Sequence, residues 1–321
     1  MIILSKKKKL LLNRELKEQQ IQRIKELLPE FEVYTELNDE SVLKDIEVVI
    51  HWTPEMGKFW EEGKLPQLKW VQAISAGVNY LPQESFREKE VILTNASGIH
   101  QHTISEHIIG VLLYHARAFD QVIKNQKNKK WEQDLTIQEL RDKTLMIFGI
   151  GNIGRRLATI AQAFGMKTVG VNTSGHQVSE VDETVAQDQC EEVLKKADYV
   201  VNILPETKET INFFDKERFS QMKEGVAFVN VGRGSSVDVA ALTEALDNGT
   251  VSFAALDVFE KEPLEEDSPL WNHKKVLITP HVSGLVEHFR DELFSVIEPN
   301  VEAFVNDGKP SVNVVDYDKS Y

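Results

Sequence analysis

The chain has 321 residues, a length that suits two domains better than one. Hydrophobic residues make up 41% and charged residues 27% of the chain, the composition of an ordinary globular protein. The net charge of −14, from 37 basic and 51 acidic residues, argues against a nucleic-acid-binding surface, because such a surface needs a basic stripe. An acidic protein can still hold a small anion in a locally positive pocket.

The cysteine content and the N-terminal segment indicate the cellular setting. The single cysteine, Cys190, excludes an intrachain disulfide, and we interpret it as a packing residue. The lysines of residues 6–9 form a solvated strand end in our interpretation, since the apolar run after them stops at Asn13 and is too short for a signal peptide. No stretch approaches the roughly 20 apolar residues of a membrane-spanning helix. We therefore expect a cytoplasmic protein with no membrane partner.

The first hundred residues alternate short apolar runs with amphipathic segments. The spacing of Ile21, Ile24 and Leu28 predicts a helix with one apolar face. Strands that alternate with helices are typical of a parallel sheet covered on both faces. The predicted strands are Leu10–Leu12, Glu32–Tyr34, Val48–Ile50, Trp70–Ala73 and Val91–Thr94.

A second series of strands and helices follows a predicted long helix, Thr103–Lys124, and a polar segment, Asn125–Lys130, that we expect on the surface. Several strands of this series are continuous apolar runs, as expected of strands buried on both faces. Six strands match the number in a complete dinucleotide-binding fold. They are Thr144–Phe148, Lys167–Val171, Tyr199–Leu204, Val226–Val231, Phe253–Leu256 and Val276–Thr279.

The chain ends with an amphipathic segment, Val286–Val305, and a tail, Ser311–Tyr321, that is strand-like and then polar. We predict an α/β protein with two doubly wound parallel-sheet domains. Residues 1–101 and 286–321 would form a flavodoxin-like substrate domain, and residues 102–285 an inserted Rossmann domain that binds NAD(P). The two long helices would be the crossovers.

A glycine motif follows the first strand of the second series. Gly149-Ile150-Gly151-Asn152-Ile153-Gly154 lies between that strand and a helical pattern, which is the context a dinucleotide-binding motif requires. Gly149 permits the tight turn, Gly151 lets the backbone approach the pyrophosphate, and Gly154 allows close helix–strand packing. The free N–H groups at the helix start, those of Asn152 and Ile153 included, would face the anion. The motif predicts NAD or NADP as cofactor.

The next strand ends in Asn172-Thr173-Ser174, where many NAD-binding proteins carry an acidic residue for the ribose hydroxyls. A carboxylate would repel the 2′-phosphate of NADP, whereas amide and hydroxyl groups can donate hydrogen bonds to it. His176 lies close, although no arginine does. We therefore expect these three residues to bind the cofactor, with a slight preference for NADP(H) over NAD(H).

Three further motifs follow later strands, at the edge where open α/β sheets bind ligands. They are Asn230-Val231-Gly232-Arg233-Gly234, Asp257-Val258-Phe259-Glu260-Lys261-Glu262-Pro263 and Thr279-Pro280-His281. With the glycine motif before them, this order resembles the D-isomer-specific 2-hydroxyacid dehydrogenases, a family that includes D-lactate, hydroxypyruvate/glyoxylate and 3-phosphoglycerate dehydrogenases. The resemblance covers essentially the whole chain and also includes Trp131, Ser75-Ala76-Gly77-Val78, Thr94-Asn95 with Gly98, Glu106, and Asn202 to Pro205 with Thr207 and Thr210.

The resemblance implies a small 2-oxo or 2-hydroxy acid as substrate and assigns three catalytic residues. Arg233 would bind the substrate carboxylate and polarise the 2-oxo group, because its planar fork matches a carboxylate. His281 would exchange a proton with the substrate, since imidazole titrates near neutrality. Glu262 would orient the ring of His281 and stabilise the imidazolium.

The remaining implied residues bind cofactor or substrate. The backbone N–H groups of Ala76, Gly77 and Val78 would hold the substrate carboxylate in an anion nest, with Arg233 and His281 as the other substrate-binding residues. Asp257 would lie near the nicotinamide and help to hold it. The other cofactor-binding residues would be Leu204, Pro205, Thr210, Val231 and Gly232.

Other histidines and Trp52 carry weaker signals. We interpret His100, His102, His107 and His115, in or near the predicted long helix, as packing, capping or solvent-exposed residues. No spacing suggests a metal site. Trp52 either lines the substrate pocket or packs in the core.

The resemblance leaves two alternative functions to weigh and implies an assembly. Formate dehydrogenases share the fold, but carry additional polar residues that are not found in this sequence. Some proteins of this fold are dinucleotide-sensing binding proteins with weak or vestigial catalysis, and the full Arg–Glu–His set argues against that reading. The small and apolar segment Val282–Leu285 is compatible with a medium-sized or apolar 2-oxo acid and gives no strong evidence for a phosphorylated one. The family commonly pairs through its long helix, here Thr103–Lys124, so we expect a homodimer.

Overall fold

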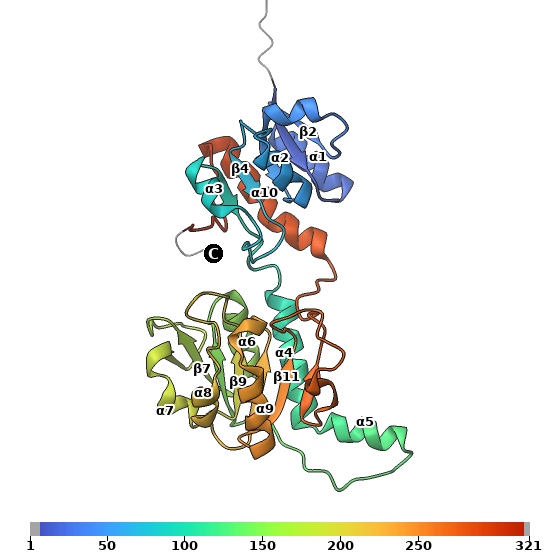
Figure 1. The fold of residues 1–321 in the computed structure, drawn as a ribbon, viewed down its shortest axis with the longest axis vertical. Helices are drawn as coiled ribbons and strands as arrows, with labels where there is room; N and C mark the ends of the chain where they lie inside the picture. Colours follow the sequence, from blue (N-terminus) through green and yellow to red (C-terminus); the bar gives the residue numbers. More distant parts are fainter. Residues whose placement is uncertain (1–6, 318–321) are drawn as a thin grey trace, which may run out of the picture. The chain divides into compact units, whose positions relative to one another are not determined.

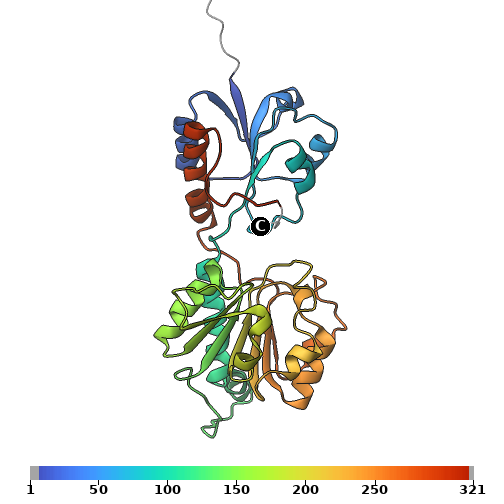
Figure 2. The same cartoon turned by 90° about the vertical axis from the view of Figure 1, so that its left-hand side faces the viewer.

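The computed structural model describes residues 7–317, so Lys6 and the last four residues of the predicted tail lie outside the described part. The chain divides into two compact units. Unit 1 combines Met1–Ile99 with Val286–Tyr321, and unit 2 is the continuous segment His100–Leu285. Each unit has a parallel sheet of its own, covered by helices on both faces (Figures 1 and 2).

Unit 1 has a five-stranded sheet with the order β2-β1-β3-β4-β5, all parallel. This is the flavodoxin-like order that the fold prediction named. Successive side chains along each strand point to opposite faces of the sheet. Its strands are β1 (Lys8–Leu12), β2 (Phe31–Tyr34), β3 (Ile46–Ile50), β4 (Trp70–Gln72) and β5 (Ile92–Thr94), and its helices are α1 (Glu18–Leu27), α2 (Pro54–Glu61), α3 (Gln83–Glu88) and α10 (Phe289–Asp307), with the short η1 (Glu40–Asp45).

The two faces of this sheet carry different cores. Leu11, Val49 and Val71 pack with the α2 and α3 side chains Phe59 and Phe86. Residues one position along the strands, such as Leu10 and Val48, pack instead with Ile24 of α1 and with Leu293 and Ile297 of α10. Two segments far apart in the sequence, α1 and α10, therefore cover one face together (Figure 2).

Unit 2 has a seven-stranded sheet with the order β12-β11-β10-β9-β6-β7-β8, again all parallel. With β6 as the first strand, the strands β8-β7-β6-β9-β10-β11 have the 3-2-1-4-5-6 order of dinucleotide-binding folds, and β12 extends the sheet by one strand. Its elements are α4 (Gln101–Ala116), α5 (Phe119–Lys127), β6 (Thr144–Phe148), α6 (Asn152–Ala163), β7 (Lys167–Asn172), β8 (Glu183–Ala186), η2 (Gln187–Gln189), α7 (Glu191–Leu194), β9 (Tyr199–Asn202), α8 (Lys216–Ser220), β10 (Val226–Asn230), η3 (Gly234–Ser236), α9 (Val239–Asn248), β11 (Val251–Leu256), η4 (Pro269–Asn272) and β12 (Val276–Ile278).

The core of unit 2 also has two halves. Ile108 and Leu112 of α4 and Leu157 of α6 cover one face, against Leu145 and Ile147 of the sheet. The other face packs Met146, Phe148 and Phe228 against Phe219 of α8 and Leu242 of α9. Cys190 is fully buried in this second cluster, and burial raises the pKa of its thiol, as expected of a packing residue.

The prediction of one continuous helix over Thr103–Lys124 is wrong. The chain forms two helices, α4 and α5, because Ala118 adopts a left-handed conformation with φ of 51°. The carbonyl oxygen of Ala116, which would continue the helix, accepts the N–H of Gln138 at 2.7 Å. The predicted surface segment begins inside α5, and strand β8 was not predicted, because it is short and only Thr184 in it is buried.

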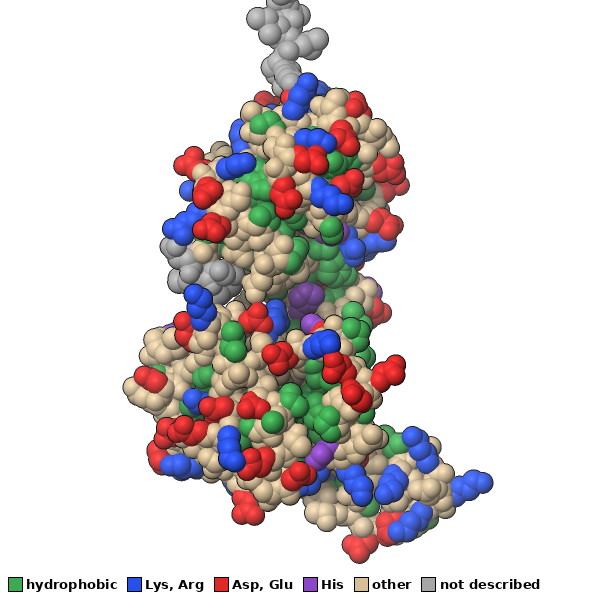
Figure 3. Space-filling view, viewed as in Figure 1, with side chains coloured by type: hydrophobic (Ala, Val, Ile, Leu, Met, Phe, Trp, Pro, Cys, Tyr) green, Lys and Arg blue, Asp and Glu red, His purple; other side chains and the backbone are tan. Residues whose placement is uncertain are grey.

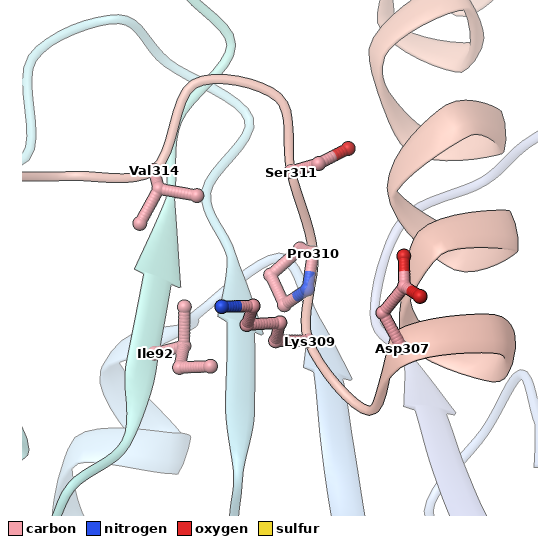
Figure 4. A pocket seen from close by; sticks show the side chains of 6 residues that line it. All are labelled: Ile92, Asp307, Lys309, Pro310, Ser311 and Val314. Atoms are coloured by element: carbon pink, nitrogen blue, oxygen red, sulfur yellow. The ribbon is translucent and has the colours of Figure 1, made fainter.

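A cavity lies in unit 1, at the edge strand β5 (Figure 4). Its volume is about 520 Å³, and Lys309 reaches across it toward Ile92. Asp307, Pro310, Ser311 and Val314 complete its lining. None of the predicted catalytic residues lines it. Among the described residues, no helix is long and apolar enough to cross a membrane.

Candidate active site

The predicted site residues of unit 2 lie at the carboxyl ends of its strands. Because all seven strands are parallel, these ends share one edge of the sheet. The glycine motif follows β6, Asn172 ends β7, Leu204 follows β9, Arg233 follows β10, Asp257 follows β11 and His281 follows β12. Six segments distant in the sequence are thus gathered at one sheet edge.

The glycine motif forms the turn from β6 into α6. Gly149 has a φ of 96°, and a Cβ there would lie 3.0 Å from the backbone of Ile203. A Cβ at Gly154 would collide with the carbonyl oxygen of Gly149, so these two glycines are required by packing. A Cβ at Gly151 would meet nothing within 4 Å. Gly151 is the N-cap of α6 and supplies no side-chain cap, which leaves the first-turn N–H groups, including those of Asn152 and Ile153, for an anion.

The end of β7 contains a buried acceptor. The Oδ1 atom of Asn172 is buried and has no hydrogen-bond partner, while its Nδ2 donates to the carbonyl of His176 at 2.8 Å. Ser174 Oγ lies 3.2 Å from Nδ1 of His176, and both side chains are exposed, as is Thr173. The nearby cation Arg155 is paired with Glu180. This turn therefore presents hydroxyl and imidazole groups and one unsatisfied amide oxygen.

The segment after β9 packs against the turn after β10. A Cβ at Gly232 would lie 2.8 Å from the carbonyl oxygen of Leu204, so only glycine fits there. Thr210 is buried, and its hydroxyl donates to the carbonyl of Pro205 at 2.7 Å, which closes the 205–210 loop. Val231 is buried beside Gly232. These residues form the wall beside the glycine turn.

Buried amides hold the turn that carries Arg233. Asn202 Nδ2 donates to Asn230 Oδ1 at 2.9 Å and to Ser236 Oγ at 2.6 Å. Asn230 Nδ2 and Ser236 Oγ in turn donate to the carbonyl of Arg233, at 3.1 and 2.6 Å. Sequence reasoning gave Asn202 and Asn230 no role and missed Ser236. The sequence signal for this network was an asparagine at the end of each of two buried strands, β9 and β10.

Arg233 is half-buried and lies close to the loop of Glu262. Its Nη1 donates to the carbonyl of Gly232 at 2.7 Å, which uses one of the five N–H groups of a guanidinium. A Cβ at Gly234 would overlap the backbone of Phe259 and Glu260. The arginine turn and the glutamate loop are therefore in direct contact.

Glu262 and His281 form an ion-pair geometry. Glu262 Oε2 lies 2.7 Å from His281 Nδ1, and Glu262 Oε1 accepts the N–H of Phe259 at 2.9 Å. A carboxylate on Nδ1 fixes the proton there and leaves Nε2 free to exchange a proton. The imidazole side chain is 54% exposed, so it is accessible to a ligand. This arrangement is that of a general acid–base group with its orienting carboxylate.

Asp257 is 1% exposed and is held within the protein. Its Oδ1 accepts the hydroxyl of Thr279 at 2.5 Å and the N–H of Val282 at 3.0 Å, and its Oδ2 accepts the N–H of Ser283 at 3.0 Å. Burial alone would raise the pKa of Asp257, but the hydrogen bonds from Ser283, Thr279 and Val282 lower it overall. The carboxylate thus shapes the turn of His281.

The predicted substrate loop lies in unit 1, after β4. Ala76 and Gly77 are partly exposed and Val78 is buried, and Ser75 Oγ donates to the carbonyl of Gly77 at 2.8 Å, so the loop turns on itself. Trp52 is 5% exposed and packs edge-on against Trp60 and Phe86, so it belongs to the core.

The residues present fit a nicotinamide dinucleotide. The open space at Gly151, the free N–H groups of α6 and the unsatisfied Asn172 Oδ1 are what a pyrophosphate and a ribose require. Among the described residues, no group of three His, Cys, Asp or Glu side chains could hold a metal ion. The fold and this edge define an α/β dinucleotide-binding protein in which a histidine is paired with a carboxylate.

Comparison with known proteins gives the family. Residues 109–283 match the family model described as D-isomer specific 2-hydroxyacid dehydrogenase, NAD binding domain. A glyoxylate/hydroxypyruvate reductase B of Enterobacter sp. (strain 638) is 33% identical over 264 residues, which cover 78% of this chain and 81% of the relative. The chain belongs to the D-isomer-specific 2-hydroxyacid dehydrogenase family.

Two solved structures extend the comparison to nearly the whole chain. A family member from Aeromonas salmonicida is 32% identical with a TM-score of 0.81, covering 97% of this chain and 100% of that one. A member from Xanthobacter autotrophicus Py2, in complex with NADPH and MES, is 25% identical with a TM-score of 0.81, covering 98% of this chain and 100% of that one. The predicted family and fold are confirmed. The protein is an oxidoreductase that transfers a hydride between NAD(P)H and a 2-oxo acid to give a D-2-hydroxy acid.

Proposed function

We propose that Arg233, Glu262 and His281 are the catalytic residues of this reaction. The observation that carries the proposal is the 2.7 Å contact between Glu262 and His281, beside a turn that holds Arg233. The guanidinium binds the substrate carboxylate and polarises the 2-oxo group. His281 Nε2 gives its proton to the oxygen as the alcohol forms, and Glu262 stabilises the charged ring. The bound nicotinamide supplies the hydride.

The substrate carboxylate is also held by the backbone N–H groups of Ala76, Gly77 and Val78. A loop that contains glycine after a strand forms an anion nest, and this loop follows β4. The cofactor-binding residues are those of the glycine motif, the Asn172–Ser174 turn, and Leu204, Pro205, Thr210, Val231 and Gly232. Asp257 shapes the neighbouring turn, so its predicted contact with the nicotinamide would use the remaining acceptor capacity of Oδ2.

NADP(H) is the preferred cofactor in this proposal. The end of β7 holds Thr173, Ser174 and His176, which can donate hydrogen bonds to a 2′-phosphate, and Asn172 in place of a repelling carboxylate. The structure of the Xanthobacter relative contains NADPH. Asn172 Oδ1 can accept a ribose hydroxyl of either dinucleotide, so NAD(H) would bind with lower affinity.

The substrate is a short, unphosphorylated 2-oxo acid such as glyoxylate or hydroxypyruvate. The name of the Enterobacter relative supports these two acids, and the small apolar segment Val282–Leu285 after His281 offers no cation for a phosphate. The test is a panel of 2-oxo acids that also contains pyruvate, phenylpyruvate and branched-chain analogues, followed by nicotinamide absorbance with NADPH and NADH in parallel.

We expect turnover of at least one short 2-oxo acid, with a higher kcat/KM for NADPH than for NADH. Arg233→Lys keeps a charge but loses the planar fork, so it should raise the KM for the 2-oxo acid more than the KM for the dinucleotide. Protein that binds dinucleotide but turns over no member of the panel would contradict the proposed substrate class and favour the dinucleotide-sensing alternative.

The protein acts as a homodimer in the cytoplasm in this proposal. The α5 helix buries none of its residues within the chain, and its apolar side chains Phe119, Val122 and Ile123 are 46%, 38% and 42% exposed. Trp131, which follows it, is 91% exposed. Lysine and arginine side chains lie on the visible face of the arm that α5 forms (Figures 1 and 3). Apolar side chains that the chain itself leaves exposed on this arm could be buried against a second copy of the chain. Sedimentation of the protein as a monomer would count against this assembly.

A further inference from the structure

The turn that carries His281 has a backbone conformation that needs support. His281 has a φ of 53°, in the left-handed region that non-glycine residues rarely adopt. Asp257 supports the turn on both sides of the histidine, through the Thr279 hydroxyl before it and the N–H groups of Val282 and Ser283 after it. The Asp257 carbonyl also accepts the N–H of His281 at 2.8 Å. The position of the imidazole therefore depends on Asp257.

A third residue reaches this network from helix α4. The Nε2 atom of His107 lies 3.4 Å from the Oγ1 atom of Thr279, and His107 is half-buried. A threonine hydroxyl has one proton, and Asp257 takes it, because its lowered pKa keeps the carboxyl group ionised and able only to accept. Thr279 Oγ1 must then accept a hydrogen bond from His107, which requires a proton on Nε2.

The surroundings of His107 keep its ring neutral near neutral pH. Burial lowers the pKa of His107, and the charge of Asp257 opposes this only in part. A neutral imidazole carries one proton, so the contact with Thr279 selects the Nε2–H tautomer. Hydrogen bonds then run in one direction, from His107 to Thr279 to Asp257, and each strengthens the next.

We propose that His107 is a positioning residue of the reaction, whose Nε2–H holds Thr279 and, through Thr279 and Asp257, the turn that presents His281. This inference rests on the proposed function, in which His281 exchanges a proton with the substrate. His107 itself touches no reacting atom. His107 lies in α4 and belongs to no motif that the sequence analysis used, where it was interpreted as a packing, capping or solvent-exposed residue.

The first test does not depend on catalysis. Long-range ¹H–¹⁵N NMR of the imidazole rings in the full-length protein distinguishes the two neutral tautomers, and His107→Gln assigns the signals by their loss. We expect the Nε2–H tautomer for His107 at pH 7. The Nδ1–H tautomer would overturn the proposal, because Thr279 would then lack its donor. Failure of the proposed function would leave this result unchanged.

The second test is kinetic. His107→Leu removes the donor and should lower kcat roughly five- to tenfold, the effect of one neutral hydrogen bond, with the KM for the dinucleotide within about twofold. His107→Gln, whose amide can donate from a similar position, should restore kcat to within about twofold of the parent. His102→Leu, at an exposed position of the same helix, is the matched control and should leave kcat unchanged.

A double-mutant cycle separates positioning from a general structural role. Thr279→Val should lower kcat by itself, and His107→Leu should then add little, because the hydrogen bond is already absent. Fully additive effects, or an equal loss of kcat in His107→Gln and His107→Leu, would overturn the proposal. Should His107→Leu fail to fold, the tautomer of the parent protein and the glutamine variant decide the question.

Discussion

At the scale of single residues, the carboxylate of Glu262 is divided between two donors. One oxygen accepts the Phe259 N–H and the other faces His281 Nδ1, so the carboxylate cannot turn away without losing a hydrogen bond. The ring of His281 is held by Glu262, and its backbone N–H is held by the carbonyl of Asp257. This double constraint would pre-organise an exposed side chain for the proton exchange that we propose for His281.

Replacement of His281 by alanine should remove most of the reductase activity while dinucleotide binding persists. A general acid contributes roughly 10²- to 10⁴-fold, so we expect at least about a hundredfold loss of kcat. The residues that we propose for dinucleotide binding follow other strands, so the dinucleotide affinity should stay within about twofold. Steady-state kinetics and fluorescence titration of NADPH measure the two effects.

Glu262→Gln is the matched variant, because the amide retains the shape and the acceptor for Phe259 N–H but loses the charge. It should lose less activity than His281→Ala. A His281→Ala protein with intact turnover and weakened dinucleotide binding would contradict the proton-exchange role.

At the scale of elements, the strand centres could be predicted from the sequence and the helix break could not. Strands such as β6 and β10 are continuous apolar runs because both faces are buried, and this signal is local. The break between α4 and α5 depends on a hydrogen bond from Gln138, which lies 22 positions after Ala116 and carries no local signal.

The site shows the same contrast between local and distant signals. The glycine turn is encoded by three closely spaced glycines, of which Gly149 and Gly154 are required by contacts within the turn itself or with the next strand end. The donors to the Arg233 carbonyl, by contrast, are held by Asn202 of β9, and the donor to Thr279 comes from α4. Such contacts depend on the strand order, which the residues themselves do not display.

Gly151→Ala should separate binding from folding at the start of α6. Gly151 has a φ of −81°, which alanine adopts, and a Cβ there would meet no atom of the protein. The unfolding free energy should therefore change by no more than about 1 kcal/mol. The methyl group would occupy the space that a pyrophosphate needs, so NADPH affinity should fall by about tenfold or more.

Gly57→Ala serves as the control, since the added Cβ would make an ordinary contact at 3.8 Å from Trp52 in unit 1. Thermal melts and equilibrium titration of both variants give the comparison. Unchanged NADPH affinity in Gly151→Ala would mean that the dinucleotide does not approach this turn.

At the scale of the whole molecule, each hydrophobic cluster of the described residues lies within one unit. Two clusters belong to unit 1 and two to unit 2, and each of the two sheets is likewise complete within its unit. Unit 2 is one continuous segment, whereas unit 1 needs both chain ends, because α10 supplies Leu293, Ile297 and Val301 to the core beside β1. The two units should therefore differ in their ability to fold alone.

A protein of residues 100–285 should fold cooperatively and bind NADPH but reduce no 2-oxo acid. It retains both cores of unit 2, the glycine turn and the Glu262–His281 pair, and it lacks the Ala76–Val78 loop that we propose for the substrate carboxylate. Residues 1–285, which lack α10, should by contrast leave one face of the unit 1 sheet uncovered and lose its cooperative transition. Circular dichroism melts and NADPH titration test both proteins. Turnover by the 100–285 protein would show that unit 1 is dispensable for the reaction, and the absence of a cooperative melt would show that unit 2 needs unit 1 to fold.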